Sequence, residues 1–201
     1  RANQNILLLM PASRPQELRY ILPTFLKTAK KLQLRYPNLV VYIPSCRTVF
    51  DKTFRKGLEK YGIQGKVISQ QDDSELMPYI YSLSKLALCK SGTVNMELAL
   101  HGIPQIVGYR VSRVTAFIAK KILNFKVKFI SPVNLLLKKL IIPEFVQQNF
   151  NEKKIYFKAC RLLNTTSEKA KIKKGYALLK RELGEKGVVE RAAKEIINSI
   201  I

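Results

Sequence analysis

Residues 86–110 read LALCKSGTVNMELALHGIPQIVGYR, and this stretch decides the fold. Residues 86–89 are apolar and too few for a buried helix, so they predict a buried strand. Ser91-Gly92-Thr93 then supplies the small and hydroxyl-bearing side chains typical of a helix start. Gly102-Ile103-Pro104 closes that helix before a second apolar run at 105–109. Strand, turn, helix and strand in this order predict one crossover of a parallel sheet.

The turn at Ser91-Gly92-Thr93 has the properties of an anion site. The first N–H groups of a helix are unpaired, and the helix dipole adds positive partial charge there. Gly92 has no Cβ, so a phosphate can approach its backbone closely. Glu97 lies about one helical turn beyond Thr93, where its carboxylate either completes the helix cap or accepts hydrogen bonds from a ribose diol. The alternative is an ordinary capped crossover without a ligand, because one glycine in a turn is a weak signal.

The rest of the chain repeats the alternation of strand and helix. Apolar runs and amphipathic periodicity predict strands at 6–10, 39–43 and 66–69 and helices at 16–36, 49–61 and 74–83. We therefore expect an α/β fold, a Rossmann-like doubly wound parallel sheet, over residues 1–150. Residues 151–201 have a helical pattern throughout, punctuated by Asn164, Gly175 and Gly184. They predict C-terminal helices that pack on that domain or cross from it.

Ligands of such sheets bind beyond the carboxyl ends of the strands. Three turns follow strands at that edge and are candidates for one site. They are Ser13-Arg14, Ser91-Gly92-Thr93 and Gly108-Tyr109-Arg110.

Further expectations concern single segments. Pro23 should kink the first helix or start it afresh. Residues 114–123 predict a compact helix, which either faces the core or lies on an anionic membrane or acyl chain. Residues 127–130 resemble a strand, and residues 131–134 predict a polar turn.

The charge balance implies an anionic partner. The chain has 36 Lys and Arg against 14 Asp and Glu, a formal charge of +22. Nucleic acid, an acidic membrane and phosphorylated substrates all fit that charge. No acidic residue lies between Glu97 and Glu144, whereas eight cations do: Arg110, Arg113, Lys120, Lys121, Lys126, Lys128, Lys138 and Lys139. The alternative is a lysine-rich composition imposed by an AT-rich genome.

The sequence contains few residues suited to disulfide, zinc or histidine chemistry. The three cysteines, Cys46, Cys89 and Cys160, are widely spaced and form no paired motif, which indicates a reducing compartment and neither a disulfide framework nor a zinc site. His101 is the only histidine, so a packing or capping role is expected for it rather than catalysis. No apolar run approaches the roughly 20 residues that span a bilayer. The early strand after Arg1 predicts a segment of a longer protein.

Four segments in order resemble the lipid-A-disaccharide synthase family, inverting glycosyltransferases with two Rossmann-like domains. They are LLMPASR at 8–14 with Glu17, SGT at 91–93 with Glu97-Leu98-Ala99, PQIVGYR at 104–110, and SPVNLL at 131–136 followed by PEFVQ at 143–147. The resemblance covers most of the chain. It implies the C-terminal, UDP-sugar-binding half of a glycosyltransferase B fold.

The resemblance also implies roles for nine residues. Ser13 and Arg14 would contact the donor's diphosphate, Gly92 and Thr93 would donate to phosphate, and Glu97 would hold the ribose hydroxyls. The other members of the expected donor site are Tyr109, Arg110, Asn134 and Gln147, of which the last two would help to shape the pocket. No metal and no cofactor is expected. The general base is expected in the N-terminal half, so this segment alone should bind nucleotide without turnover.

The substrates implied are UDP-2,3-diacylglucosamine as donor and 2,3-diacylglucosamine 1-phosphate as acceptor. Both are anionic amphiphiles, which agrees with the positive charge. The expected partners are therefore an anionic membrane surface and an N-terminal domain, with no nucleic acid. The expected location is the cytoplasmic face of the inner membrane, as a peripheral protein, or the equivalent compartment of a bacterium-derived organelle.

The sequence departs from the family pattern at two places. Ala12 replaces the usual glycine before Ser13, and Leu137-Lys138-Lys139 stands where the family has Ala-Gly-Arg, so that lysine would act there as a point charge. Three alternatives stay open: another UDP-sugar glycosyltransferase or epimerase, a basic nucleic-acid-binding module, and a non-catalytic relative.

Overall fold

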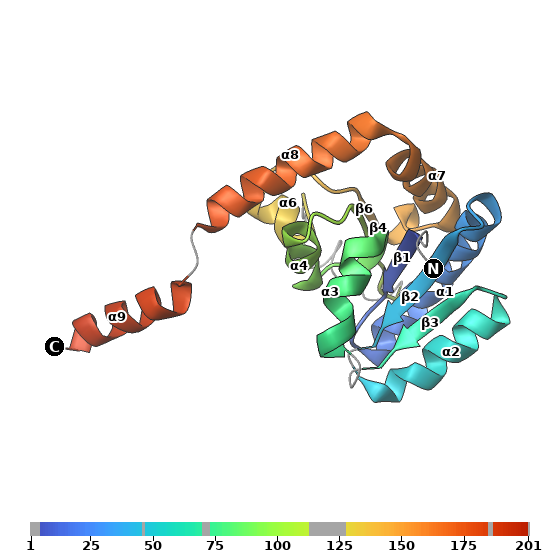
Figure 1. Ribbon diagram of the computed structural model, residues 1–201, viewed down its shortest axis with the longest axis horizontal. Helices are drawn as coiled ribbons and strands as arrows, with labels where there is room; N and C mark the ends of the chain where they lie inside the picture. The colour runs from blue at the N-terminus through green and yellow to red at the C-terminus, as the bar shows by residue number, and fades with distance from the viewer. Residues whose placement is uncertain (1–4, 46, 70–72, 113–127, 185–186, 201) are drawn as a thin grey trace.

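The computed structural model describes residues 5–45, 47–69, 73–112, 128–184 and 187–200. Its centre is a six-stranded sheet in the order β3-β2-β1-β4-β5-β6, in which every neighbouring pair is parallel. The strands are β1 Asn5–Met10, β2 Leu39–Pro44, β3 Gly65–Ile68, β4 Ser84–Lys90, β5 Gln105–Tyr109 and β6 Glu144–Val146. The expected α/β Rossmann-like sheet is confirmed (Figure 1).

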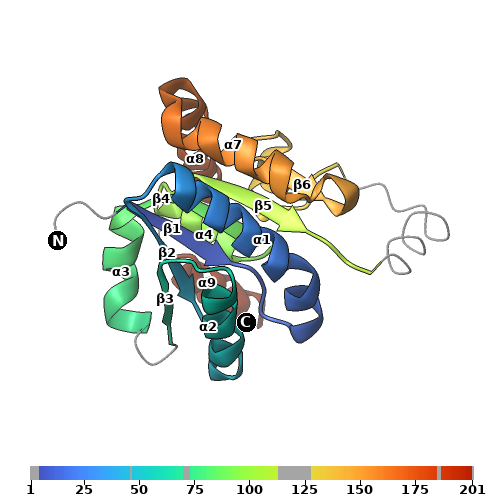
Figure 2. The same cartoon turned by 90° about the vertical axis from the view of Figure 1, so that its right-hand side faces the viewer.

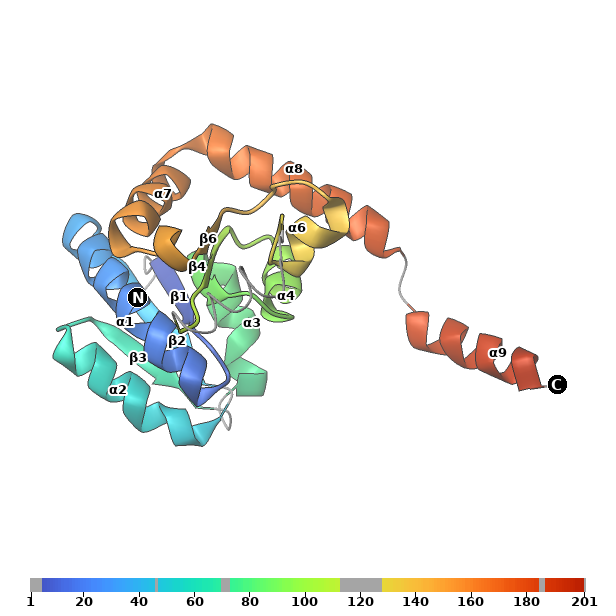
Figure 3. The ribbon, with the colours of Figure 1, turned by 180° about the vertical axis from the view of Figure 1, so that it is seen from behind.

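Helices connect the strands and cover both faces of the sheet. They are α1 Pro15–Arg35, α2 Asp51–Lys60, α3 Asp73–Leu83, α4 Val94–Leu100, α6 Pro132–Leu137, α7 Glu152–Asn164, α8 Thr166–Leu183 and α9 Val188–Ile200, with short 3-10 turns η1 Thr48–Phe50 and η4 Gln147–Asn149. Helix α1 packs against α2 and α7, while α4 packs against α6 and α8 (Figures 2 and 3). The sheet is doubly wound, because the chain builds outward from β1 in one direction and then returns to build outward from β4.

The strands are apolar because both faces of the sheet are covered. Ile6, Leu7, Leu8 and Leu9 are all buried, although their side chains alternate between the two faces. Close packing extends to backbone contacts. A Cβ on Gly108 of β5 would lie 2.2 Å from the Phe150 ring, which itself meets Phe25 of α1 edge-on at 5.3 Å between ring centroids.

The C-terminal helices continue from this core. Helix α7 lies along α1, and α8 runs on to α4 and α6, while α9 follows Gly184 and lies apart from the sheet (Figure 1). Tyr176 of α8 is buried and donates a hydrogen bond to the Ile103 carbonyl oxygen. Among the described helices, none is long and apolar enough to cross a membrane.

Three of the segment predictions need correction. The first helix runs unbroken through Pro23, whose ring is on the exposed side, so no fresh start occurs there. Residues 128–130 form no strand, because the Ile130 amide donates to the Glu144 carboxylate instead of to a ladder, and the sixth strand is β6. The predicted turn at 131–134 is the start of α6, with Ser131 as N-cap and Pro132 in the first turn.

The helical breaks at Asn164 and Gly184 are confirmed, but Gly175 lies inside α8. A Cβ there would lie 2.1 Å from Ile141 Cγ2, so this glycine serves close packing instead of a break. The helix expected at 114–123 lies outside the described residues. So do Cys46 and the cations Arg113, Lys120, Lys121 and Lys126.

Candidate functional site

A cleft of about 700 Å³ opens at the carboxyl edge of the sheet, between the ends of β1 and β4. These strands are neighbours, and the winding direction of the sheet reverses between them. The connections that leave them diverge to opposite faces at such a point and leave a crevice. The cleft is lined by residues 10–13 at the end of β1 and in the turn after it, and by residues 90–94 at the end of β4, in the turn after it and at the start of α4. Met77 and Tyr81 of α3, Glu97 of α4 and His101 directly after α4 also line it.

Four of the predicted site residues come together in this cleft. They are Ser13, Gly92, Thr93 and Glu97. Arg14 directly follows Ser13 as the exposed N-cap residue of α1, and its side chain makes no capping hydrogen bond. The Ser13-Arg14 turn and the Ser91-Gly92-Thr93 turn therefore meet at one edge, as their positions after β1 and β4 predicted.

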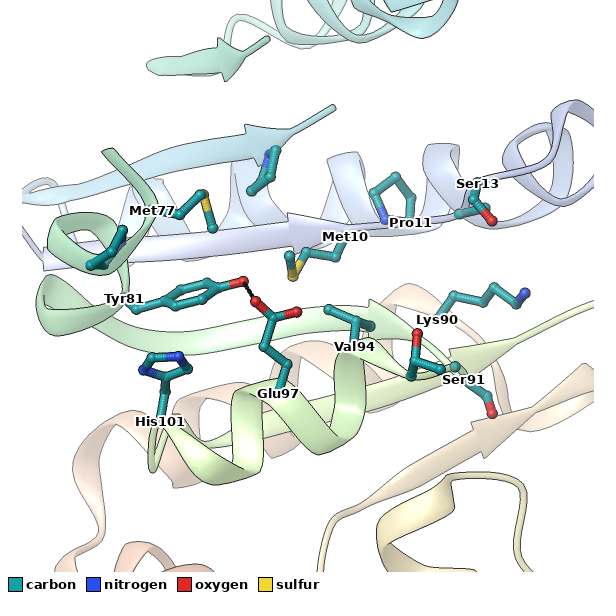
Figure 4. A pocket seen from close by; sticks show the side chains of 15 residues that line it. Met10, Pro11, Ser13, Met77, Tyr81, Lys90, Ser91, Val94, Glu97 and His101 are labelled. Carbon is teal, nitrogen blue, oxygen red and sulfur yellow. Dashed lines mark hydrogen bonds between the residues drawn. The ribbon is translucent and has the colours of Figure 1, made fainter. Parts of the chain in front are cut away.

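The cleft has two chemically different ends (Figure 4). At one end the Tyr81 hydroxyl donates to Glu97 Oε1 over 2.8 Å, and the His101 ring lies 4.7 Å from the Tyr81 ring, centroid to centroid. At the other end lie Ser13, Lys90 and Ser91. His101 thus packs against Tyr81 and also lines the cleft.

The buried side-chain amide of Asn95 holds the Ser91-Gly92-Thr93 turn in place. Asn95 Oδ1 accepts from the Gly92 N–H at 2.9 Å, and Asn95 Nδ2 donates to the Lys90 carbonyl oxygen and to Gln105 Oε1. The Gly92 amide is thus engaged by the Asn95 side chain. The amides of Thr93 and Val94, by contrast, have no hydrogen-bond partner among the described residues. The space where a Cβ of Gly92 would lie is open, so a ligand can approach that backbone.

The same turn is also hydrogen-bonded to the segment that precedes α6. Ser91 Oγ donates to the Ile130 carbonyl oxygen at 2.5 Å. The Glu144 carboxylate accepts from the amides of Ile130 and Ser131, from Ser131 Oγ and from Asn134 Nδ2. These hydrogen bonds hold residues 130–134, which include the start of α6, against the start of β6.

Asn134 is fully buried in that cluster and does not line the cleft. Its Nδ2 also donates to the Ile142 carbonyl oxygen, and its Oδ1 accepts from the amides of Ile141 and Ile142. All of its hydrogen-bonding capacity thus serves the chain around it. Asn134 could therefore affect donor binding only indirectly, by positioning Glu144 and the segment at 130–131 that Glu144 holds.

Tyr109, Arg110 and Gln147 lie near one another and are not among the residues that line the cleft. Arg110 Nη2 donates to the Gln147 carbonyl oxygen at 3.1 Å, and its guanidinium lies 5.5 Å from the centroid of the Phe150 ring. Gln147 takes a left-handed backbone conformation with φ of 50°. The structure therefore joins Arg110 to Gln147 as a pair and leaves both outside the cleft lining.

Two cleft residues were missed by the sequence reasoning. Tyr81 belongs to a helix that was predicted, but its pairing with Glu97 joins α3 to α4 and has no local sequence signal. Lys90 directly precedes the predicted turn, and its position at a strand end was a signal available in the sequence. Its ammonium forms a 2.8 Å ion pair with Glu17 of α1.

The Cys89 thiol near the turn is fully buried. Burial raises the pKa of Cys89 far above its usual range, and its sulfur donates toward Gln105 Oε1. In the part of the chain that the structure describes, no three His, Cys, Asp or Glu side chains gather as metal ligands.

Comparison with known proteins adds to this geometry. The family model for lipid-A-disaccharide synthetase matches residues 1–200. The lipid-A-disaccharide synthase of Prochlorococcus marinus is 46% identical over 98% of this chain and 50% of its own length, and that of Gloeothece citriformis is 36% identical over 100% and 51%. The chain thus spans about half the length of these relatives.

Solved structures agree on the fold. The C-terminal CMP-Kdo-binding domain of WaaA from Acinetobacter baumannii superposes with a TM-score of 0.57 at 11% identity, covering 92% of this chain and 91% of that one. The C-terminal domain of a glycosyl transferase group 1 protein from Francisella tularensis gives a TM-score of 0.57 at 15% identity, with 88% and 85% covered. The family model matches nearly the whole sequence, and the relatives are up to 46% identical. This chain therefore belongs to the lipid-A-disaccharide synthetase family.

Proposed function

We propose that this chain is the donor-binding half of a lipid-A-disaccharide synthase. In this proposal it holds UDP-2,3-diacylglucosamine, whose sugar is transferred to 2,3-diacylglucosamine 1-phosphate. The observation that carries the proposal is the cleft at the β1–β4 crevice, where Ser13, Gly92, Thr93 and Glu97 meet although two turns and a helix supply them.

The two ends of the cleft suit the two polar parts of a nucleoside diphosphate. Glu97 lies at one end, where its carboxylate would accept hydrogen bonds from the ribose hydroxyls while Tyr81 fixes its orientation. Ser13 lies at the other end beside the turn, where hydroxyl and amide donors would bind phosphate oxygens. A carboxylate near the sugar and donors near the phosphates avoid repulsion between Glu97 and the diphosphate.

Arg14 would add charge at the phosphate end. Its side chain is exposed and makes no cap, so it is available to an anion that lies over the start of α1. Charge on the diphosphate grows as UDP departs, and a guanidinium stabilises that charge through paired hydrogen bonds. Thr93 would contribute its free amide and its hydroxyl to the same phosphates.

Four of the predicted donor-site residues would act less directly. Asn134 would position the segment that Ser91 contacts, and Tyr109, Arg110 and Gln147 would border the site from β5 and η4. The acceptor site and the general base would belong to an N-terminal domain. The exposed lysines and the acylated substrates favour a peripheral position on an anionic cytoplasmic membrane face.

Calorimetric titration with UDP tests the proposal. We expect saturable binding in the micromolar to millimolar range. Arg14→Ala should weaken the binding of UDP more than that of uridine, whereas Glu97→Ala should weaken both. Arg19→Ala is the matched control, because Arg19 is an exposed arginine five residues further along α1. If the folded wild-type chain does not bind UDP, the donor-site proposal is wrong, and duplex or single-stranded nucleic acid becomes the next ligand to titrate.

A further inference from the structure

Lys90 and Glu17 form an ion pair that joins the two turns of the cleft. Lys90 is the last residue of β4 and directly precedes Ser91, and Glu17 lies in the first turn of α1, just after Arg14. The ammonium nitrogen lies 2.8 Å from Glu17 Oε1, and the exposed fractions of the side chains are 20% for Lys90 and 12% for Glu17. The pair is therefore largely withdrawn from water, where charges interact more strongly than on an open surface.

Lys90 is the one lysine or arginine among the described residues that line the cleft. Its ammonium has three N–H donors. Glu17 Oε1 is the one oxygen among the described residues with which it forms an ion pair or a hydrogen bond. Two donors consequently remain for a ligand that enters the cleft beside Ser13 and Ser91.

Glu17 has little other than Lys90 to satisfy its charge. Its Oε2 is buried and has no hydrogen-bond partner among the described residues. A buried carboxylate with one partner holds that partner strongly, because removal of the cation would leave an uncompensated charge. The carboxylate would also repel an incoming anion if the ammonium did not lie between them.

We propose that Lys90 binds the diphosphate of the nucleotide-sugar and that Glu17 is the residue that positions its ammonium. This inference rests on the function proposed above and adds a residue to the phosphate end of that site. In the bound state the ammonium bridges Glu17 and the phosphate oxygens. No proton changes place, and the positive charge stays fixed while negative charge builds on the departing UDP.

The test compares UDP with uridine, which lacks the phosphates. Lys90→Met should weaken UDP binding about tenfold or more and leave uridine binding unchanged, because a hydrogen bond to a charged group is lost only with UDP. Lys90→Arg should retain most of the UDP affinity, since it keeps the charge. Lys85→Met is the matched control: Lys85 is an exposed lysine on the same strand, at the end away from the cleft.

A double variant separates lost attraction from new repulsion. Lys90→Met alone leaves the Glu17 carboxylate unpaired, and that charge could itself disfavour UDP or unfold the protein. Lys90→Met with Glu17→Gln removes both charges while keeping the shapes close. We expect the double variant to bind UDP as weakly as Lys90→Met does, and its salt dependence of UDP binding to be shallower than that of the wild type.

Wild-type affinity for UDP in Lys90→Met or in the double variant would overturn this inference, because the pair would then be only a structural bridge. An equal loss of UDP and uridine affinity in both variants would overturn it too, since the effect would not concern phosphate. If the wild-type chain binds no UDP, the donor-site function fails and this inference fails with it. If the wild-type chain and the variants bind UDP equally well, the role of Lys90 is wrong but the donor-site function stands.

Discussion

The Tyr81 hydroxyl donates to Glu97 Oε1 at 2.8 Å, so a residue of α3 orients the carboxylate that α4 presents to the cleft. The Tyr81 ring in turn lies against His101 at the end of α4. The orientation of Glu97 therefore depends on packing between two helices and not on its own helix alone.

Tyr81→Phe should lower UDP affinity roughly fivefold, the effect of one hydrogen bond. If Glu97 holds the ribose diol, 2′-deoxy-UDP should bind the wild type more weakly than UDP does, and this difference should shrink in Tyr81→Phe. Calorimetry with both nucleotides measures the two effects. Tyr79→Phe is the control, because Tyr79 is an exposed tyrosine of the same helix. An unchanged preference for UDP over 2′-deoxy-UDP in Tyr81→Phe would show that Tyr81 does not act through the ribose contact.

Tyr176→Phe should destabilise the fold by about 1–2 kcal/mol. The Tyr176 hydroxyl accepts from Gln105 Nε2 at 3.1 Å and donates to the Ile103 carbonyl oxygen at 2.9 Å, and burial raises the pKa of this phenol. Its removal leaves buried partners unsatisfied. Urea unfolding measures the change, with Tyr20→Phe on the more open surface of α1 as the control. Equal stability of the two variants would contradict the importance of the buried network.

Gly175→Ala should also destabilise the fold, by about 1–3 kcal/mol, although alanine favours helices. The new Cβ would lie 2.1 Å from Ile141 Cγ2, so α8 or the segment before β6 must shift. Thermal unfolding of Gly175→Ala, Ile141→Ala and the double variant checks this cause. The double variant should be more stable than the sum of the single changes implies, since alanine at 141 removes the clash. Simple additivity would contradict the steric explanation.

Glu168 should make stability depend on pH in the acid range. Its carboxylate in α8 accepts from Lys158 and Arg161 of α7, each at 2.6 Å. The hydrogen bond from Lys158 lowers the pKa of Glu168, burial opposes this, and the neighbouring cations lower the pKa further. A lowered folded-state pKa gives stability that is full above the unfolded-state value of about 4.3 and is lost as pH falls through the folded-state value.

Glu168→Gln should therefore lower the free energy of unfolding by about 1 kcal/mol or less at pH 7, because the exposed Arg161 is screened by water. Near pH 3 the variant and the wild type should be almost equally stable. Urea unfolding at both pH values measures the difference, with the exposed Glu182→Gln as the control. A loss of the same size at both pH values would mean that the carboxylate charge contributes nothing.

Much of the fold could be predicted because its signals are local. Five of the six strands contain short apolar runs, as in residues 6–10, and two short turns after them contain small or hydroxyl-bearing residues. The parallel arrangement then follows from alternation with helices, and the edge at which Ser13 and Gly92 meet follows from the direction of parallel strands.

The rest depends on contacts between segments that are distant in sequence. β6 is three residues long and only half-buried, so it has no apolar run to reveal it. The segment at 128–130 is apolar enough to resemble a strand, but its Ile130 amide is claimed by Glu144. Asn134 lies in a segment expected to shape the pocket, yet its side-chain oxygen accepts hydrogen bonds from the backbone amides of Ile141 and Ile142. No local pattern records such partners.

The pairing of β1 with β4 also has a consequence for the order in which the protein forms during synthesis. Met10 lies beside Cys89 in the sheet, so the two walls of the cleft come from segments almost eighty residues apart. A ribosome that extends the chain from its N-terminus exposes one apolar edge of β1 until β4 has emerged. The cleft can therefore form only after β4 has paired with β1. A nascent chain that ends within α3 leaves the edge of β1 that faces β4 unpaired.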